Sequence, residues 1–149
     1  QRSKMKDISP LTKKFSRYIL THPDSIFYFL NCSTPGNSFV CVVCVDGTFT
    51  CILRDLELGH YKQHQVDMEF VTYSENNPID LLIHVLGTYP HDVCTIAIEI
   101  DSPRFLLSEA KQLFEYLPFV NFVDISMTVK LMGRNLVEIV PTSLPELPI

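Results

Sequence analysis

The sequence predicts an α/β domain in which helices cover a mixed β-sheet. Apolar, β-branched segments alternate along the chain with segments of helical periodicity. One pair of these strands is joined by Asp46-Gly47, a dipeptide typical of a tight hairpin turn. Hydrophobic residues make up 46% of the 149 residues, enough for the core of one domain and too little length for a second.

The first elements follow from helix start signals and apolar runs. A helix is expected to begin at Ser9, which precedes a proline, and to run to Arg17. Residues 18–20 form a short strand that stops at His22-Pro23, and a turn or short helix follows over residues 24–30.

The central hairpin is the clearest β signal. Residues 39–45 are apolar without interruption, as expected of a central strand that is covered on both faces. Residues 48–53 return after the turn as the antiparallel partner.

Helices and strands continue to alternate in the second half. Further strands are expected at residues 68–73, 95–100 and 121–125. Further helices are expected at residues 56–65, at residues 78–86 with Gly87 as their end, and in a segment capped by residues 101–103 and stopped by Pro118. The core face of that last helix is predicted to be Leu106, Ala110, Leu113, Phe114 and Leu117. One contiguous core is predicted to include Phe39, Val43, Ile96, Ile98, Leu113 and Leu117.

Composition argues against several functional classes. Twelve Lys and Arg face 17 Asp and Glu, for a net charge of −5, and no basic run interrupts the chain, so no nucleic-acid partner is expected. Residues 25–45 are uncharged, but they contain the loop signature 31–38, so no membrane span is expected. Five cysteines, an odd number, and a polar N-terminus favour reduced thiols and a cytoplasmic location.

Two pairs of metal-ligating residue types occur at suggestive spacing. Cys41 and Cys44 have zinc-knuckle spacing, but on a strand these positions point to opposite faces. His60 and His64 lie at i and i+4 on the predicted helix, with no third ligand nearby in sequence, so they are weak metal candidates and a solvated helix face is the favoured interpretation. Nucleotide-binding glycine motifs and a nucleophile elbow are absent from the sequence, which predicts no cofactor and no catalytic residue in this chain.

Several segments resemble one known family in the same order along the chain. Residues 19–30 (ILTHPDSIFYFL) resemble the opening of the creatinase and Xaa-Pro peptidase N-terminal domain, and residues 39–53 resemble its hairpin. Residues 53–57 (LRDLE) resemble the Arg-x-Leu-Glu stretch that follows the hairpin. Residues 96–126 resemble the closing unit of that domain.

The resemblance implies a three-layer α/β/α, ribonuclease-H-like fold with a mixed sheet of roughly five to six strands. In the family this domain precedes a catalytic "pita-bread" domain, in which Asp, Asp, His, Glu and Glu commonly hold two metal ions. The divalent metal is therefore expected in a catalytic domain missing from this chain. The resemblance assigns residues 1–132 to the N-terminal domain and leaves residues 133–149 as a divergent C-terminal tail, extended or disordered.

The resemblance also implies a role and a site. In relatives the domain supports homodimerisation and helps to cover the partner's active site, which makes Arg54, Asp55 and Asn31 the candidate substrate contacts. Arg54 could bind a substrate carboxylate with two hydrogen bonds, and the alternative is a surface ion pair with Asp55 or Glu57.

Three functions stay open on the sequence alone. The chain is the non-catalytic domain of a peptidase-like metallohydrolase, or a stand-alone protein-interaction module of the same fold, or a self-sufficient enzyme with zinc on His60 and His64. The apolar residues 27–30 and the proline-rich apolar tail predict exposed surface and therefore a homodimer, with a monomer covered by its own tail as the alternative.

Overall fold

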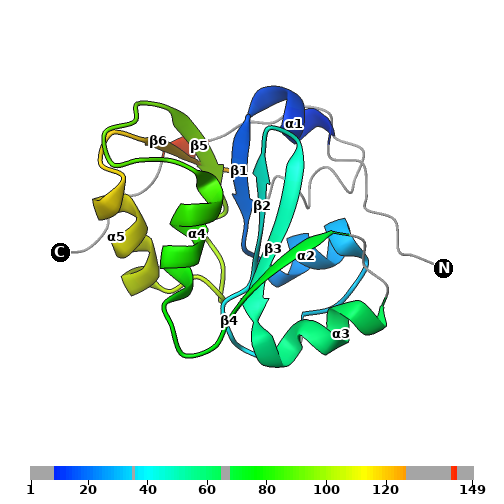
Figure 1. Cartoon of the computed structure of the whole chain (residues 1–149). Helices are drawn as coiled ribbons and strands as arrows, with labels where there is room; N and C mark the ends of the chain where they lie inside the picture. The colour runs from blue at the N-terminus through cyan, green and yellow to red at the C-terminus, as the bar shows by residue number, and fades with distance from the viewer. Residues whose placement is uncertain (1–8, 35, 65–67, 127–141, 144–149) are drawn as a thin grey trace.

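A mixed β-sheet runs through the centre of the molecule in the computed structural model, which describes residues 9–34, 36–64, 68–126 and 142–143 (Figure 1). Within these residues the strand order is β4-β3-β2-β1-β5-β6-β7. The strands are β1 (Arg17–Leu20), β2 (Cys41–Val45), β3 (Thr48–Arg54), β4 (Glu69–Tyr73), β5 (Thr95–Ile98), β6 (Asn121–Asp124) and β7 (Thr142–Ser143). The helices are α1 (Ser9–Lys14), α2 (Pro23–Leu30), α3 (Leu58–Gln63), α4 (Pro78–Leu86) and α5 (Leu107–Tyr116), with the 3-10 turn η1 (Asp55–Glu57) leading into α3.

Five strands of the sheet run in the same direction, so their carboxyl ends lie along one side of the sheet, which we call the carboxyl edge. β1 pairs in parallel with β5, β5 with β6, and β3 with β4. β2 is antiparallel to both β1 and β3, and β7 is antiparallel to β6. The residues that directly follow β1, β3, β4, β5 and β6 therefore lie along the same edge, which is where open α/β sheets place their functional side chains.

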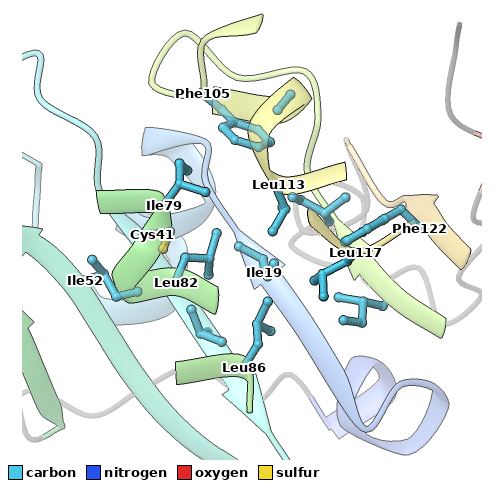
Figure 2. Close-up of a cluster of buried hydrophobic side chains, with 14 of the residues drawn as sticks. Ile19, Cys41, Ile52, Ile79, Leu82, Leu86, Phe105, Leu113, Leu117 and Phe122 are labelled. Carbon is cyan, nitrogen blue, oxygen red and sulfur yellow. The ribbon is translucent and has the colours of Figure 1, made fainter. Parts of the chain in front are cut away.

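Two apolar cores, one on each face of the sheet, produce the three-layer arrangement. α1 and α2 pack on one face together with Tyr61 of α3, whereas α4 and α5 pack on the other. Figure 2 shows the second core, where Ile19 of β1 lies between α4 residues and Leu113 and Leu117, which lie in α5 and directly after it. The predicted core set is confirmed, because all of its members belong to this cluster: Phe39, Val43, Ile96, Ile98, Leu113 and Leu117.

The turn and cap signals of the sequence are confirmed. Asp46 and Gly47 both have positive φ, 51° and 83°, as a tight hairpin turn requires. Asn77 caps α4 by accepting a hydrogen bond from the backbone N–H of Ile79 at 2.9 Å, and Gly87 ends that helix with φ of 62°.

The start of α5 was predicted wrongly. The helix begins at Leu107, and residues 101–103 lie before it in a separate loop. The carboxylate of Glu109 reaches back to accept the backbone N–H of Leu106 at 2.8 Å, so the first turn is satisfied by a residue inside the helix. Leu106 is 59% exposed and does not belong to the core face, and Phe114 is only half-buried.

Other boundaries differ by a few residues. α1 ends at Lys14, because Arg17 already pairs with Val45 of β2. The helix predicted over residues 56–65 begins as η1 and continues as α3 to Gln63, while residue 65 lies outside the described residues. The short β7 pairs with β6 and adds a seventh strand to the expected five or six. The rest of the predicted tail, residues 133–141 and 144–149, also lies outside the described residues.

Residues 27–30 are only partly exposed, in contrast to the prediction from sequence. Phe27 is 51% exposed, whereas Phe29 and Leu30 are buried against the sheet. In the described part of the chain, no helix has the length and apolar character needed to cross a membrane.

Candidate functional site

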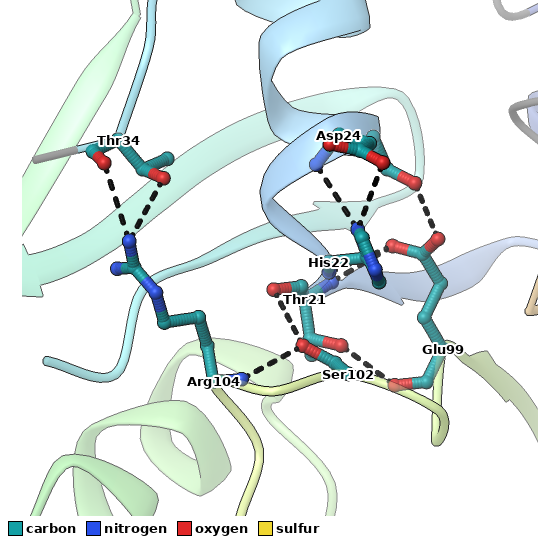
Figure 3. A network of polar contacts seen from close by, with 8 residues as sticks. Thr21, His22, Asp24, Thr34, Glu99, Ser102 and Arg104 are labelled. Carbon is teal, nitrogen blue, oxygen red and sulfur yellow. Dashed lines mark hydrogen bonds and ion pairs between the residues drawn. The ribbon is translucent and has the colours of Figure 1, made fainter. Parts of the chain in front are cut away.

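A buried carboxylate ties two neighbouring strand ends together at the carboxyl edge. Glu99, which follows β5, accepts hydrogen bonds at Oε1 from the backbone N–H groups of Thr21 at 2.9 Å and His22 at 3.2 Å. Its other oxygen, Oε2, accepts a hydrogen bond from the Ser25 hydroxyl. Burial raises the pKa of Glu99 from 4.5 to about 7, although these three donors oppose the rise. Figure 3 shows Glu99 and Thr21 within this network.

The network continues into the loop that precedes α5. The Ser102 hydroxyl donates to the carbonyl of Thr21 at 3.0 Å and accepts the backbone N–H of Arg104 at 3.1 Å. The Arg104 guanidinium then reaches the loop between α2 and β2, where it donates to the Ser38 carbonyl at 3.0 Å. It also donates to both oxygens of Thr34 at 3.2 Å, as Figure 3 shows. Arg104 therefore fixes the loop that carries the sequence-predicted contact Asn31.

Glu57 of η1 lies against the same loop. A Cβ on Gly36, whose φ is 67°, would lie 2.8 Å from Oε1 of Glu57, so a side chain at this position would collide with the carboxylate. Burial raises the pKa of Glu57, and the charges of Arg104 and Arg54 oppose the rise. The positive charge of Arg54 therefore acts on the Glu57 carboxylate.

The predicted substrate contacts all reach the carboxyl edge with their side chains exposed. Arg54 ends β3, and Asp55 begins η1 directly after it. Asn31 ends α2 in the left-handed conformation, with φ of 55°, and its backbone N–H donates to the Phe27 carbonyl at 2.7 Å. No hydrogen bond joins Asn31 to Arg54 within the described residues, and both side chains are exposed.

The two predicted histidines acquire a third neighbour. His60 and His64 share one face of α3, as predicted, with ring centroids 4.4 Å apart. Cys32, which follows α2, places its Sγ 3.5 Å from Nε2 of His60. Cys32 is therefore a third potential ligand, close in space but 28 positions from His60 in the sequence. His60 is also half-buried, so the pair is not a fully solvated face.

Cys41 and Cys44 do point to opposite faces, as predicted. Cys41 lies in the core beneath α4 and α5, and Cys44 lies in the core beneath α1 and α2. These two thiols cannot bind one ion, because the sheet separates them.

Sequence reasoning missed Glu99, Arg104 and Cys32 as members of this edge. Glu99 carries a usable signal, since it is a charged residue that continues the apolar run of β5. Arg104 and Cys32 carry none, because their partners lie far along the chain.

Comparison with known proteins gives the family. The sequence model of the Creatinase/Prolidase N-terminal domain matches residues 11–132. The chain belongs to this family. No curated protein sequence matches the chain.

Solved structures share the fold of this creatinase/prolidase N-terminal domain. A proline dipeptidase from Streptococcus pneumoniae is 19% identical, with a TM-score of 0.63 over 87% of this chain and 94% of that one. The N-terminal domain of the Xaa-Pro dipeptidase from Lactobacillus brevis is 18% identical, with a TM-score of 0.66 over 83% of this chain and 94% of that one. The X-Pro aminopeptidase from Thermotoga maritima is 22% identical, with a TM-score of 0.63 over 85% of this chain. The chain spans only 35% of that aminopeptidase, so it corresponds to one part of a larger protein there.

Proposed function

We propose that the chain is the non-catalytic N-terminal domain of a creatinase- or Xaa-Pro-peptidase-like metallohydrolase, in which it supports dimerisation and covers the active site of the partner subunit. The observation that carries this proposal is the family match over residues 11–132, combined with the 35% of the aminopeptidase that the chain spans. The remaining length of such a relative has room for a catalytic domain, which would hold the divalent metal. The five free thiols of the chain suit a cytoplasmic location.

The carboxyl edge supports a covering role because its loops are fixed while its polar side chains stay exposed. Glu99 and Arg104 hold the loops after β1, α2 and β5 together. Arg54 and Asp55 extend into solvent from a turn held between β3 and α3. A guanidinium in this position could bind a peptide carboxylate with two hydrogen bonds, and the Asp55 carboxylate could bind a peptide ammonium.

The first test is the reading frame downstream of Ile149. A following segment with the Asp, Asp, His, Glu and Glu ligand set supports the metallohydrolase, and the purified chain by itself should then hydrolyse no Xaa-Pro dipeptide with added Mn²⁺, Zn²⁺ or Co²⁺. Metal-dependent turnover by the chain alone that disappears in a His60→Ala/His64→Ala double variant would contradict the proposal.

The second test measures substrate binding in the full-length protein. Arg54→Ala should raise KM for an Xaa-Pro dipeptide about tenfold or more, as expected for the loss of a charge-assisted hydrogen bond, with little effect on kcat. Lys13→Ala, which removes an exposed positive charge from α1 at the amino end of β1, is the matched control and should leave KM unchanged. Equal KM values for Arg54→Ala and wild type would exclude Arg54 as a substrate contact.

A protein-interaction module is the alternative function, and one observation favours it. Large apolar side chains are exposed on α5 and on the loops at its two ends, where a partner could cover them: Leu106, Leu107, Tyr116 and Phe119. A reading frame that continues from Ile149 into a long acidic segment, without the five metal ligands, would support this alternative.

A further inference from the structure

Three ligand-bearing side chains converge beside the carboxyl edge, outside the substrate contacts proposed above. Cys32 comes from the segment after α2, and His60 and His64 come from α3. One potential ligand atom from each lies within 4.8 Å of the other two. Among the described residues this is the one group of three or more Cys, His, Asp and Glu side chains with such spacing.

The spacing fits a tetrahedral ion of zinc size. Zinc binds thiolate sulfur at about 2.3 Å and imidazole nitrogen at about 2.0–2.1 Å, so sulfur and nitrogen on neighbouring corners of a tetrahedron lie about 3.6 Å apart. The Sγ of Cys32 and Nε2 of His60 are 3.5 Å apart. These two atoms already stand at the separation that an ion between them requires.

Backbone contacts orient His64 as a ligand. Its Nδ1–H donates to the carbonyl oxygen of His60 at 2.8 Å, which leaves the lone pair on Nε2. Metal-binding histidines commonly donate their other ring N–H to a carbonyl in this way, because the hydrogen bond fixes both the tautomer and the ring direction.

Exposure increases in order across the three side chains. Cys32 is 1% exposed, His60 is half-buried and His64 is exposed, so an ion can enter from solvent and a water molecule can complete its coordination. A thiolate with two imidazoles is a donor set that suits Zn²⁺ better than Mg²⁺ or Ca²⁺, which prefer oxygen ligands.

We propose that Cys32, His60 and His64 bind one Zn²⁺ ion, with water as the fourth ligand. Binding converts the Cys32 thiol to a thiolate and releases its proton to solvent. Nε2 of His60, which contacts the Ser33 carbonyl at 2.9 Å, gives up that hydrogen bond and the imidazole carries its proton on Nδ1. The ion links the segment after α2 to α3 and so holds in place the loop that carries Asn31.

The test uses the untagged full chain, stripped of metal and kept reduced, and titrated with Zn²⁺ by calorimetry and with Co²⁺ by absorbance. One Zn²⁺ per chain is expected, and Co²⁺ should give a thiolate-to-metal charge-transfer band. Cys32→Ser should abolish that band, and both Cys32→Ser and His64→Ala should weaken Zn²⁺ binding at least tenfold. Cys94→Ser and His91→Ala are matched controls, since these residues lie outside the cluster, and both should bind as wild type does.

A second measurement separates metal loss from misfolding. The exposed side chain of His64 makes His64→Ala a variant that should keep the apo melting temperature of wild type. Zn²⁺ should raise the melting temperature of wild type and of both controls, and should raise that of His64→Ala by less at the same Zn²⁺ concentration. The proposal is overturned if wild type binds no Zn²⁺, if two chains share one ion, or if Cys32→Ser retains the cobalt charge-transfer band.

Discussion

Thr21 and Glu99 bind each other reciprocally across the carboxyl ends of β1 and β5. The backbone N–H of Thr21 donates to the Glu99 carboxylate at 2.9 Å, and the Thr21 hydroxyl donates to the Glu99 backbone carbonyl at 2.6 Å. Both residues are buried and lie 78 positions apart in the chain. The pair therefore ties the end of β1 to the end of β5 at the edge where the candidate site lies, and its strength should depend on the protonation of Glu99.

Stability should fall as pH rises through the range in which Glu99 ionises. The pKa of Glu99 is about 7 in the folded chain against an ordinary 4.5, so the folded state binds the proton more tightly than the unfolded state. This contribution, about 3 kcal/mol, is fully present below about pH 4.5 and is lost by about pH 7. Urea unfolding at a series of pH values measures it.

Glu99→Gln should remove much of this pH dependence. The amide oxygen can still accept both backbone N–H groups and the amide NH₂ can donate to Ser25, so the network survives without a charge. Glu57 and Glu109 also have raised pKa values and act in the same direction, so the difference between variant and wild type isolates Glu99. Glu115→Gln, an exposed change, is the control, and an equal pH slope for Glu99→Gln and wild type would contradict the assignment.

The Arg104 clamp should control the order of loop 31–38. Arg104→Lys keeps the charge, but a single ammonium cannot reach the Ser38 carbonyl and both oxygens of Thr34 at once. Loss of charge-assisted hydrogen bonds at about 1.5–3 kcal/mol should speed amide exchange in this loop roughly tenfold or more. Hydrogen–deuterium exchange measures this rate, and Arg54→Lys serves as the exposed control. Unchanged exchange in Arg104→Lys would mean that the loop is held by other contacts.

The sequence predicted correctly those parts of the fold that are determined by residues within the element itself, such as turn and cap residues. Asp46-Gly47 specifies its hairpin turn, and Asn77 with Gly87 marks both ends of α4, because the required backbone conformations suit few other residues. The prediction for the start of α5 was wrong because Ser102-Pro103 is a typical helix start, whereas leucine is an unfavourable N-cap residue. The Glu109 carboxylate accepts a hydrogen bond from the Leu106 N–H, which allows a leucine at the N-cap position. The Ser102 hydroxyl forms hydrogen bonds with the backbone of Thr21 and Arg104 and does not cap the helix.

The candidate site was only half predictable for a different reason. The i, i+4 spacing of His60 and His64 specifies a shared helix face without any knowledge of the fold. Cys32 joins them because the segment after α2 returns past α3 on its way to β2, and this depends on the strand order. Arg104 meets Thr34 across 70 positions for the same reason.

Leu113→Ala should destabilise the domain by about 2–5 kcal/mol, as is typical of a leucine buried in a core. Leu113 is fully buried on the inner face of α5, among the residues of Figure 2. Leu106→Ala is the matched control, since the same atoms are removed from a side chain that is 59% exposed, and it should cost less than about 0.5 kcal/mol. Chemical unfolding of both variants measures the two values, and similar values would contradict the placement of α5.

Self-association is expected to use the exposed apolar residues on α5 and at its two ends. Apolar residues on α5 and at its ends are exposed, with Phe119 at 62%, Leu107 at 47% and Tyr116 at 45%. The other helical layer exposes Phe27, whose neighbours Phe29 and Leu30 are buried, so it offers less apolar surface. A stable twofold contact would bury at least about 1,000 Å² in total, which favours the larger of the two surfaces.

Sedimentation equilibrium over a hundredfold range of concentration should therefore show a dimer that dissociates on dilution. Phe119→Ser should shift the equilibrium towards the monomer, because it removes an exposed aromatic ring from the contact. Phe27→Ser, which changes a phenylalanine of similar exposure, 51%, on the opposite layer, should leave the equilibrium unchanged. A single 17.1 kDa species at every concentration would refute the dimer and favour a monomer whose own tail covers this face.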